Sequence, residues 1–372
     1  MREFPAILAA ALLGAGIAQA QTPPSASKEE ISALKTRPFT WADALETRGN
    51  AGPAQVKTNI SNTPARQAWI DTLADMVKRS YTPYGALPQA FRNINPYRTG
   101  MTDYRPLEYG MTFVMQDPTI KAGKITRSPI PSLSVIYAYA NSLSGAEGAW
   151  EINTPSQFYF TMRFEPDGTL VDPKERAADG PDIAAIKRAV GRDCIVMTMS
   201  GGYIVLLIPG GRLPVVPVTI GEALDAAEAG IRRRQAGSEP ADAGTYAARM
   251  AGVARSRALH AHELGRPARV RDYQFSHGSF QNEWDPFIGT RGDVLWPLYK
   301  VDPSVYARTA AGGPQWLAFG FPRLKYNQLP RDHAIYDAMT QRFDYRSAYD
   351  AVFAPGATPA SAKAAYRPRG AP

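Results

Sequence analysis

The chain has only one cysteine, Cys194, among its 372 residues, so an intramolecular disulfide is excluded. It also lacks the glycine-rich phosphate loops of nucleotide-binding proteins and the Gly-x-Ser-x-Gly turn of many serine hydrolases. We therefore expect no cofactor. Cys194 lies in an apolar, strand-like run, which predicts a buried and unreactive thiol.

Long apolar runs are equally scarce. Residues 6–17 form one, but it is shorter than the roughly 20 residues that a membrane-spanning helix needs. Ala18-Gln19-Ala20 follows it with the small-x-small pattern of a signal peptidase site. We expect cleavage between Ala20 and Gln21, a periplasmic or secreted protein, and no membrane-spanning segment; the alternative is a buried N-terminal helix.

Positive charge is in excess, with a formal net charge of +8. Much of this excess lies between residues 231 and 271, where nine arginines face three acidic residues. A basic segment can attract an anionic envelope polymer or envelope protein, while the alternative is a solvated helical surface. Nucleic acid is not expected as a partner, because the segment has few aromatic residues to stack on bases.

The 32 prolines and 31 glycines indicate many turns and short elements rather than a helical bundle. Apolar periodicity predicts a helix after Asn62, strands over residues 110–116, 132–140 and 157–164, and a short helix closed by Gly191. Residues 194–199 and 203–208, joined through Gly201-Gly202, predict a β-hairpin. Thr219 and Glu222 have the spacing of a helical capping box. Strands and helices without regular alternation predict an α+β fold with mixed or antiparallel sheets.

These patterns divide the chain into six parts. We expect a signal peptide (1–20), a loose N-terminal arm (21–60), an α+β core region (61–225), an Arg/Ala-rich helical connector (226–268), a C-terminal α+β region (269–353) and a disordered tail (354–372).

Four short segments resemble those of a group of uncharacterised exported bacterial proteins. They are YTPYGALP at Tyr81–Pro88, PVTIGE at Pro217–Glu222, PLYKVDPSVY at Pro297–Tyr306 and PQW at Pro314–Trp316. The resemblance covers most of the chain after the signal peptide. It implies one exported module with a long connecting helix after Glu222, and it implies no activity or functional residue.

Two groups of polar residues are candidates for chemistry. His260 and His262, with His277 brought in by folding, have side chains of the type that binds zinc; the alternative is surface histidines. His277 with Glu283 or Asp285 has the functional groups of a hydrolase acting on envelope or extracellular material. The alternative is a polar loop whose side chains cap the backbone.

Aromatic residues gather between positions 284 and 316, among them Trp284, Trp296, Tyr299 and Trp316. If exposed, they would form a platform for sugar rings or a partner protein, and if buried, an ordinary core. We favour burial. The leading hypothesis is a non-catalytic, exported or envelope-associated binding module, and the hydrolase is the alternative.

Overall fold

The computed structural model describes residues 27–47, 62–94, 107–128, 133–143, 159–191, 194–199, 201–237, 243–273, 275–281 and 284–370. The predicted signal peptide lies outside these ranges, as does the beginning of the predicted N-terminal arm. The predicted α+β class is confirmed, since helices and largely antiparallel sheets occur together. Within the described residues, no helix is both long and apolar enough to cross a membrane.

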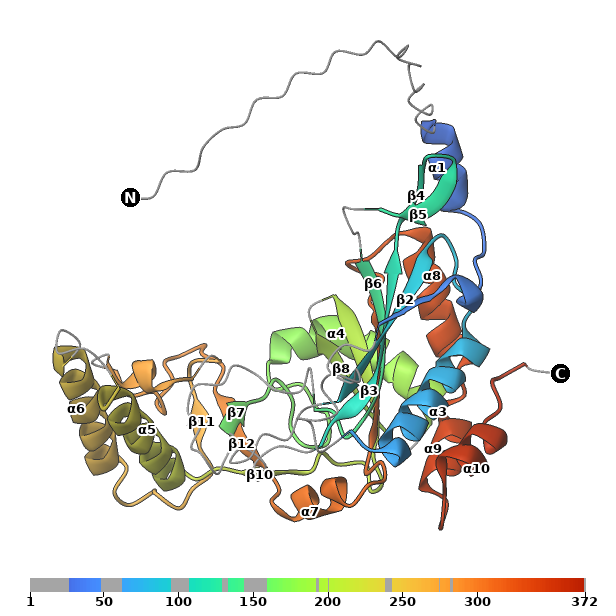
Figure 1. The fold of residues 1–372 in the computed structure, drawn as a ribbon. Helices are drawn as coiled ribbons and strands as arrows, with labels where there is room; N and C mark the ends of the chain where they lie inside the picture. Colours follow the sequence, from blue (N-terminus) through green and yellow to red (C-terminus); the bar gives the residue numbers. More distant parts are fainter. Residues whose placement is uncertain are drawn as a thin grey trace, which may run out of the picture.

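The main sheet has seven strands whose order in space departs from their order in the chain (Figure 1). In spatial order they are β1 (Leu45–Thr47), β2 (Leu87–Ile94), β3 (Tyr109–Gln116), β6 (Leu133–Ala140), β13 (Leu317–Pro322), β9 (Gly202–Leu207) and β8 (Cys194–Met199). Among these described strands, only β1 and β2 pair in parallel. The late strand β13 thus lies between two much earlier ones, and its end becomes important for the site.

Helices cover one face of this sheet because alternate strand residues there are apolar and fully buried. They are α3 (Pro64–Ser80), α8 (Pro330–Asp337), a π-helical turn η5 (Ala338–Arg342), α9 (Tyr345–Phe353) and α10 (Pro359–Ala365). The predicted helix after Asn62 is confirmed: Thr63 caps α3, Pro64 opens it, and Trp69 and Leu73 are buried.

The prediction of a disordered C-terminal tail is wrong. A capping box formed by Thr358 and Ser361 starts α10, and Tyr366 behind it is fully buried. The Tyr366 hydroxyl lies 2.6 Å from Ser80 Oγ at the end of α3. The tail is rich in small residues because it packs closely against α3 and α9, and that composition resembles a flexible linker when it is judged alone.

The described part of the predicted loose arm, residues 27–47, packs against the rest of the protein. Its helix α1 (Lys28–Leu34) is followed by a short 3-10 turn, η1 (Trp41–Asp43). Leu34 and Phe39 are buried against Leu87 in a small third core. Beside this core lies the two-stranded hairpin of β4 (Pro118–Lys121) and β5 (Lys124–Arg127).

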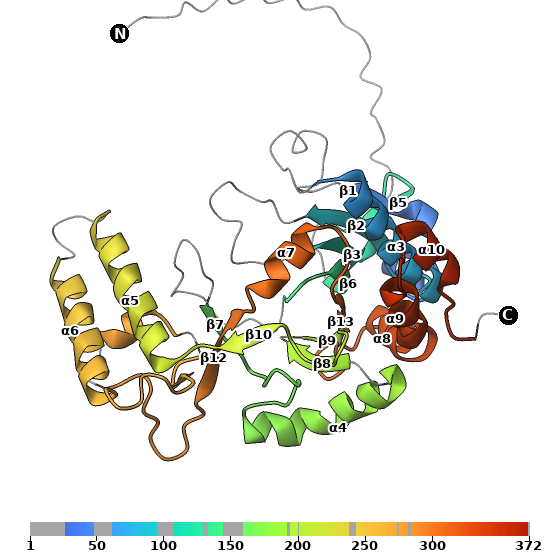
Figure 2. The ribbon, with the colours of Figure 1, turned by 90° about the horizontal axis from the view of Figure 1, so that it is seen from below.

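A second core lies away from the main sheet, around the helix pair α5 (Ile220–Gln235) and α6 (Ala243–Leu259) (Figures 1 and 2). The remaining strands of this region are β7 (Tyr159–Thr161), β10 (Val215–Pro217), β11 (Arg269–Val270) and β12 (Trp296–Val301), with a short helix η4 (His277–Phe280). Of the strand predicted over 157–164, residues 157 and 158 lie outside the described residues, and β7 covers the first three of the remaining six and pairs with β12.

The cores do not follow the predicted division of the chain. The second core combines residues 218–298 with Tyr159, so the expected boundary at 268/269 falls inside it. The expected connector therefore forms no isolated helix: α5 and α6 pack against each other. Helix α7 (Ser304–Ala310) then leads the chain back to the main sheet.

Two local predictions were partly right. The β8–β9 hairpin is confirmed, with Gly201 at a φ of 79° in its turn, but Cys194 is part-exposed rather than buried. Thr219 accepts from the Glu222 amide, as a capping box requires. The Glu222 carboxylate instead accepts from Lys300 Nζ at 2.5 Å and from the Tyr159 hydroxyl at 3.1 Å. It fastens α5 to β12 and β7.

Candidate functional site

His260 and Asp285 meet in a buried polar cluster in the second core. His260 Nε2 lies 3.1 Å from Asp285 Oδ1, and the Ser256 hydroxyl donates to Asp285 Oδ2 at 2.5 Å. The Phe287 amide also donates to this carboxylate. Asp285 therefore joins α6 to the turn that follows residue 284. His260 is buried, so the expectation of a surface histidine fails for it.

This cluster is arranged for structure rather than for hydrolysis. In a catalytic triad the histidine lies between the carboxylate and the hydroxyl, whereas here Asp285 lies between Ser256 and His260. His262 is exposed. The His277 side chain and Glu283 lie outside the described residues, and the described part contains no group of three metal-ligating side chains.

The aromatic residues between positions 284 and 316 are spread over different environments. Trp316 is buried in the main core and donates to the Ser142 carbonyl, while Tyr299 is buried and donates to Glu165 Oε2. Trp284 lies under the Arg271 guanidinium. Trp296 is part-exposed and meets Tyr273 edge to face. They form no single platform.

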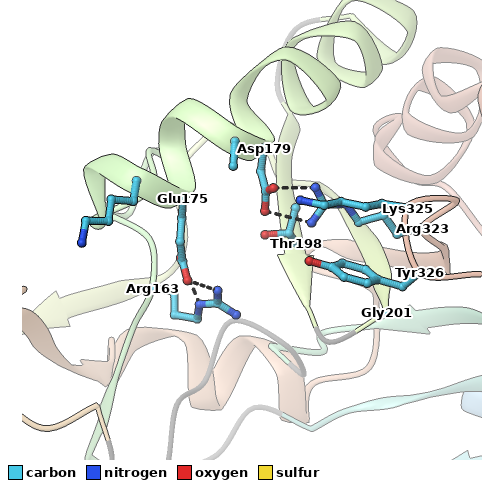
Figure 3. Close-up of a pocket in the computed structure, with 10 residues that line it drawn as sticks. Arg163, Glu175, Asp179, Thr198, Gly201, Arg323, Lys325 and Tyr326 are labelled. Carbon is cyan, nitrogen blue, oxygen red and sulfur yellow. Dashed lines mark hydrogen bonds and ion pairs between the residues drawn. The ribbon is translucent and has the colours of Figure 1, made fainter.

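An open cleft of about 590 Å³ lies elsewhere, along helix α4 (Pro173–Val190) (Figure 3). One wall is α4, and the other is formed by the β8–β9 hairpin and the segment that follows β13. The lining residues are Arg163, Lys174, Glu175, Ala178, Asp179, Thr198, Gly201, Arg323, Lys325 and Tyr326. None of them was among the candidate catalytic, metal-ligating or binding residues that the sequence suggested.

Helix α4 presents its acidic residues to the cleft through its own periodicity. Asp172 caps its first turn and Pro173 opens it. Glu175 and Asp179 are four residues apart, so they lie on one face. The sequence predicted only a short helix before Gly191, but α4 has 18 residues and contains Pro181. Its first half carries the cleft residues.

The cleft contains a buried ion pair between Asp179 and Arg323. Arg323 Nη1 donates to Asp179 Oδ2 at 2.9 Å and Nη2 donates to Oδ1 at 2.5 Å, a bidentate arrangement. Only 3% of Arg323 and 7% of Asp179 is exposed. Burial alone would raise the pKa of Asp179, but the hydrogen bonds and charge of Arg323 outweigh it, so this pKa is lowered.

The segment after β13 is fixed to the hairpin turn through Gly201. The Arg323 amide donates to the Gly201 carbonyl at 2.9 Å, and Asn327 Nδ2 donates to the same oxygen at 2.6 Å. Tyr203, on β9, lies 5.6 Å from the Arg323 guanidinium and donates its hydroxyl to Asp182. Arg323 is therefore held from several sides before any ligand arrives.

A second arginine–carboxylate pair lies farther along the cleft. Arg163, just after β7, pairs with Glu175 through both Nε and Nη2. The pair links α4 to the strand β7 of the second sheet. Both carboxylates of the cleft are thus neutralised by arginine.

Positive charge remains after these two pairs are accounted for. Among the described residues, the lining has four basic and two acidic side chains, and the surplus is Lys174 and Lys325. Both are exposed, and neither forms an ion pair with a described residue. Lys325 lies beside Arg323, and its charge also lowers the pKa of Asp179 (Figure 3).

Two hydroxyl groups point into the cleft between these charges (Figure 3). Tyr326 is 62% exposed. Thr198 is only 3% exposed, and its hydroxyl lies close enough to Asp179 to lower that pKa, yet its oxygen accepts no hydrogen bond from the described residues. A buried oxygen without a donor is costly unless a ligand or water satisfies it.

The residues of the cleft come from four separate segments, and the sequence alone gives little indication that these segments meet. The signals that existed were the Glu175/Asp179 spacing on a helix and the polar run Arg323-Leu-Lys-Tyr326 directly after an entirely buried strand. Comparison with models of known protein families, with curated proteins and with solved structures gave no match.

Proposed function

We propose that this protein is an exported, non-catalytic binding module, released by cleavage after Ala20, whose cleft along α4 binds an anionic polymer of the cell envelope or its surroundings. The observation that carries the proposal is that two exposed lysines, Lys174 and Lys325, line the cleft in addition to two arginine–carboxylate pairs whose charges cancel. Lys325 is exposed, has no ion-pair partner in the described chain and stands next to the fixed pair of Arg323 and Asp179.

The arrangement suits binding better than catalysis. A general base needs a carboxylate whose pKa lies near the working pH. Asp179 has a lowered pKa and is held by two hydrogen bonds, and Glu175 is held by Arg163. In contrast, an anion can bind to the exposed Lys325 while these fixed pairs stay in place, so the rest of the cleft need not reorganise and the entropic cost is smaller.

The experiment uses protein recovered from outside the cytoplasm after expression of the full chain, and Gln21 is the expected first residue. Binding of poly-glutamate is measured by calorimetry at low salt. Lys325→Glu is expected to weaken it at least tenfold, and added salt should weaken it further.

The matched control is Arg232→Glu on α5, which changes the net charge by the same amount. Arg232 is already paired with Glu228 and lies on the separate helix pair. The affinity of this variant for poly-glutamate should therefore stay within about twofold of the wild-type value. Equal losses in the two variants would mean that only net charge matters and would contradict a cleft site. No binding of any acidic polymer by the wild type would also contradict it.

A further inference from the structure

Aromatic rings stand near both ends of the cleft. At one end is Tyr326, the most exposed large aromatic residue among those described. The Arg323 guanidinium lies 5.3 Å from its ring centre and Lys325 Nζ lies 5.6 Å from it. These cations hold the ring in place next to the positive charge, and its exposed surface remains available for stacking.

At the other end of the cleft, the lining residue Arg163 lies near Tyr273 and Trp296, which are not themselves among the lining residues. The Met162 amide donates to the Pro297 carbonyl at 3.1 Å, which brings neighbouring Arg163 close to β12. The Thr161 hydroxyl donates to the Tyr273 carbonyl at 2.5 Å. Burial raises the pKa of Tyr273, and its hydroxyl is near enough for Arg163 to lower this pKa and Glu175 to raise it.

Tyr273 and Trp296 form an edge-to-face pair, with ring centres 5.1 Å apart and an interplanar angle of 66°. Both rings are part-exposed. The cleft therefore has two surplus lysines, and an aromatic surface lies near each of its ends. A ligand that matches this order needs flat, weakly polar faces as well as negative groups.

Building on the proposed function, we propose that the ligand is an acidic glycan, a chain of sugars that carry carboxylate or phosphate groups. Its sugar rings stack on Tyr326 and on the Tyr273–Trp296 pair, while its anionic groups lie against Lys325 and Lys174. A sugar acid supplies an apolar ring face and a charge in each unit, whereas an acidic peptide supplies charges without a ring to stack.

The test compares three probes on the same protein: an oligogalacturonate, its fully methyl-esterified form, and poly-glutamate of equal charge. The acidic sugar is expected to bind at least tenfold more tightly than either of the other two. Tyr326→Ala should remove most of this preference, and Tyr326→Phe, which keeps the ring, should retain it.

Controls separate loss of the site from loss of the fold. Leu259→Ala removes another exposed apolar side chain, on α6, and should leave binding unchanged. Tyr273→Ala is used only if its melting curve matches the wild type, and it should reduce sugar binding while leaving poly-glutamate binding intact.

Each outcome decides between the two proposals. Equal binding of oligogalacturonate and poly-glutamate overturns the glycan proposal but leaves the anion-binding cleft standing. Binding of neither acidic probe overturns both. Equal preference in Tyr326→Ala and wild type shows that the ring does not select the sugar and overturns the assignment of Tyr326.

Discussion

The arginines of the α5–α6 helix pair lie at the surface, whereas the cleft beside α4 contains a buried arginine, Arg323. At least five of the nine arginines between residues 231 and 271 pair with carboxylates: Arg232, Arg257, Arg266, Arg269 and Arg271. Most of their partners come from outside that stretch, for example Asp225 and Glu228 on the facing helix. The strongly basic segment is therefore largely neutralised by its own fold.

The cleft reverses this relation. Its segments carry both signs of charge, as in Lys174-Glu175-Arg176 at the start of α4, but folding brings four basic and two acidic side chains together among the described lining residues. One arginine is buried with its partner, and exposed lysines lie beside the pair. The comparison shows that an excess of positive charge in one stretch of sequence does not predict an excess of positive charge at one place in the folded protein. The reason is that ion pairs form between segments that are distant in sequence.

The largest expected effect comes from breaking the buried pair. Arg323→Ala leaves the Asp179 carboxylate buried without its partner and should cost about 3–5 kcal/mol of unfolding free energy. Arg257→Ala removes an ion-paired arginine of similar size from the helix pair, where water screens the charges, and should cost less than about 1 kcal/mol. Both values come from urea unfolding.

A double variant checks the reason for this difference. Replacing Arg323 by Met and Asp179 by Leu together removes both charges, so it should recover most of the stability that Arg323→Ala loses. Equal costs for Arg323→Ala and Arg257→Ala would show that the two regions do not differ in how they stabilise charge.

The next largest effect comes from the close packing of α6 against η4, which does not depend on charge. A Cβ added at Gly252 in α6 would lie 1.9 Å from the Phe280 carbonyl oxygen. Gly252→Ala should therefore push α6 away from η4 and cost about 3 kcal/mol in urea unfolding. Gly244→Ala on the same helix meets nothing within 4 Å and should be neutral or stabilising by up to about 1 kcal/mol. Similar effects of the two would contradict this contact.

Those parts of the fold that depend on nearby residues could be predicted from the sequence. The helix after Asn62 and the β8–β9 hairpin rest on side chains within a few positions of each other. The place of β13 between β6 and β9 could not, because strand order depends on pairing across long stretches of chain. The tail was missed for the same reason: its partner α3 is almost 300 residues away.

The candidate site was missed because no single segment carries it. Asp179 and Arg323 are 144 residues apart, and the sequence pattern around each of them gives no sign of the other. His260 and Asp285 attracted attention because histidine and paired acids are familiar in active sites, yet their role is to fasten a turn to α6. Residue type suggested chemistry there, and geometry corrected it.

The smallest expected effect is a difference in how stability depends on pH. The folded pKa of Asp179 is lowered, mainly because Arg323 outweighs the effect of burial. Its ionised form therefore stabilises the fold above the unfolded pKa of about 3.9, and this stabilisation is lost as the pH falls through the lower folded value.

Asp179→Asn cannot lose a proton from that site, so its unfolding free energy should fall less steeply than that of the wild type below about pH 4. Chemical unfolding at a series of pH values measures both slopes. The variant is less stable at pH 7, so the slopes are compared rather than the absolute values. Equal slopes would mean that the Asp179 charge is no better stabilised in the cleft than in the unfolded chain. The buried ion pair of the cleft would then not differ in this respect from the solvent-exposed ion pairs of α5 and α6.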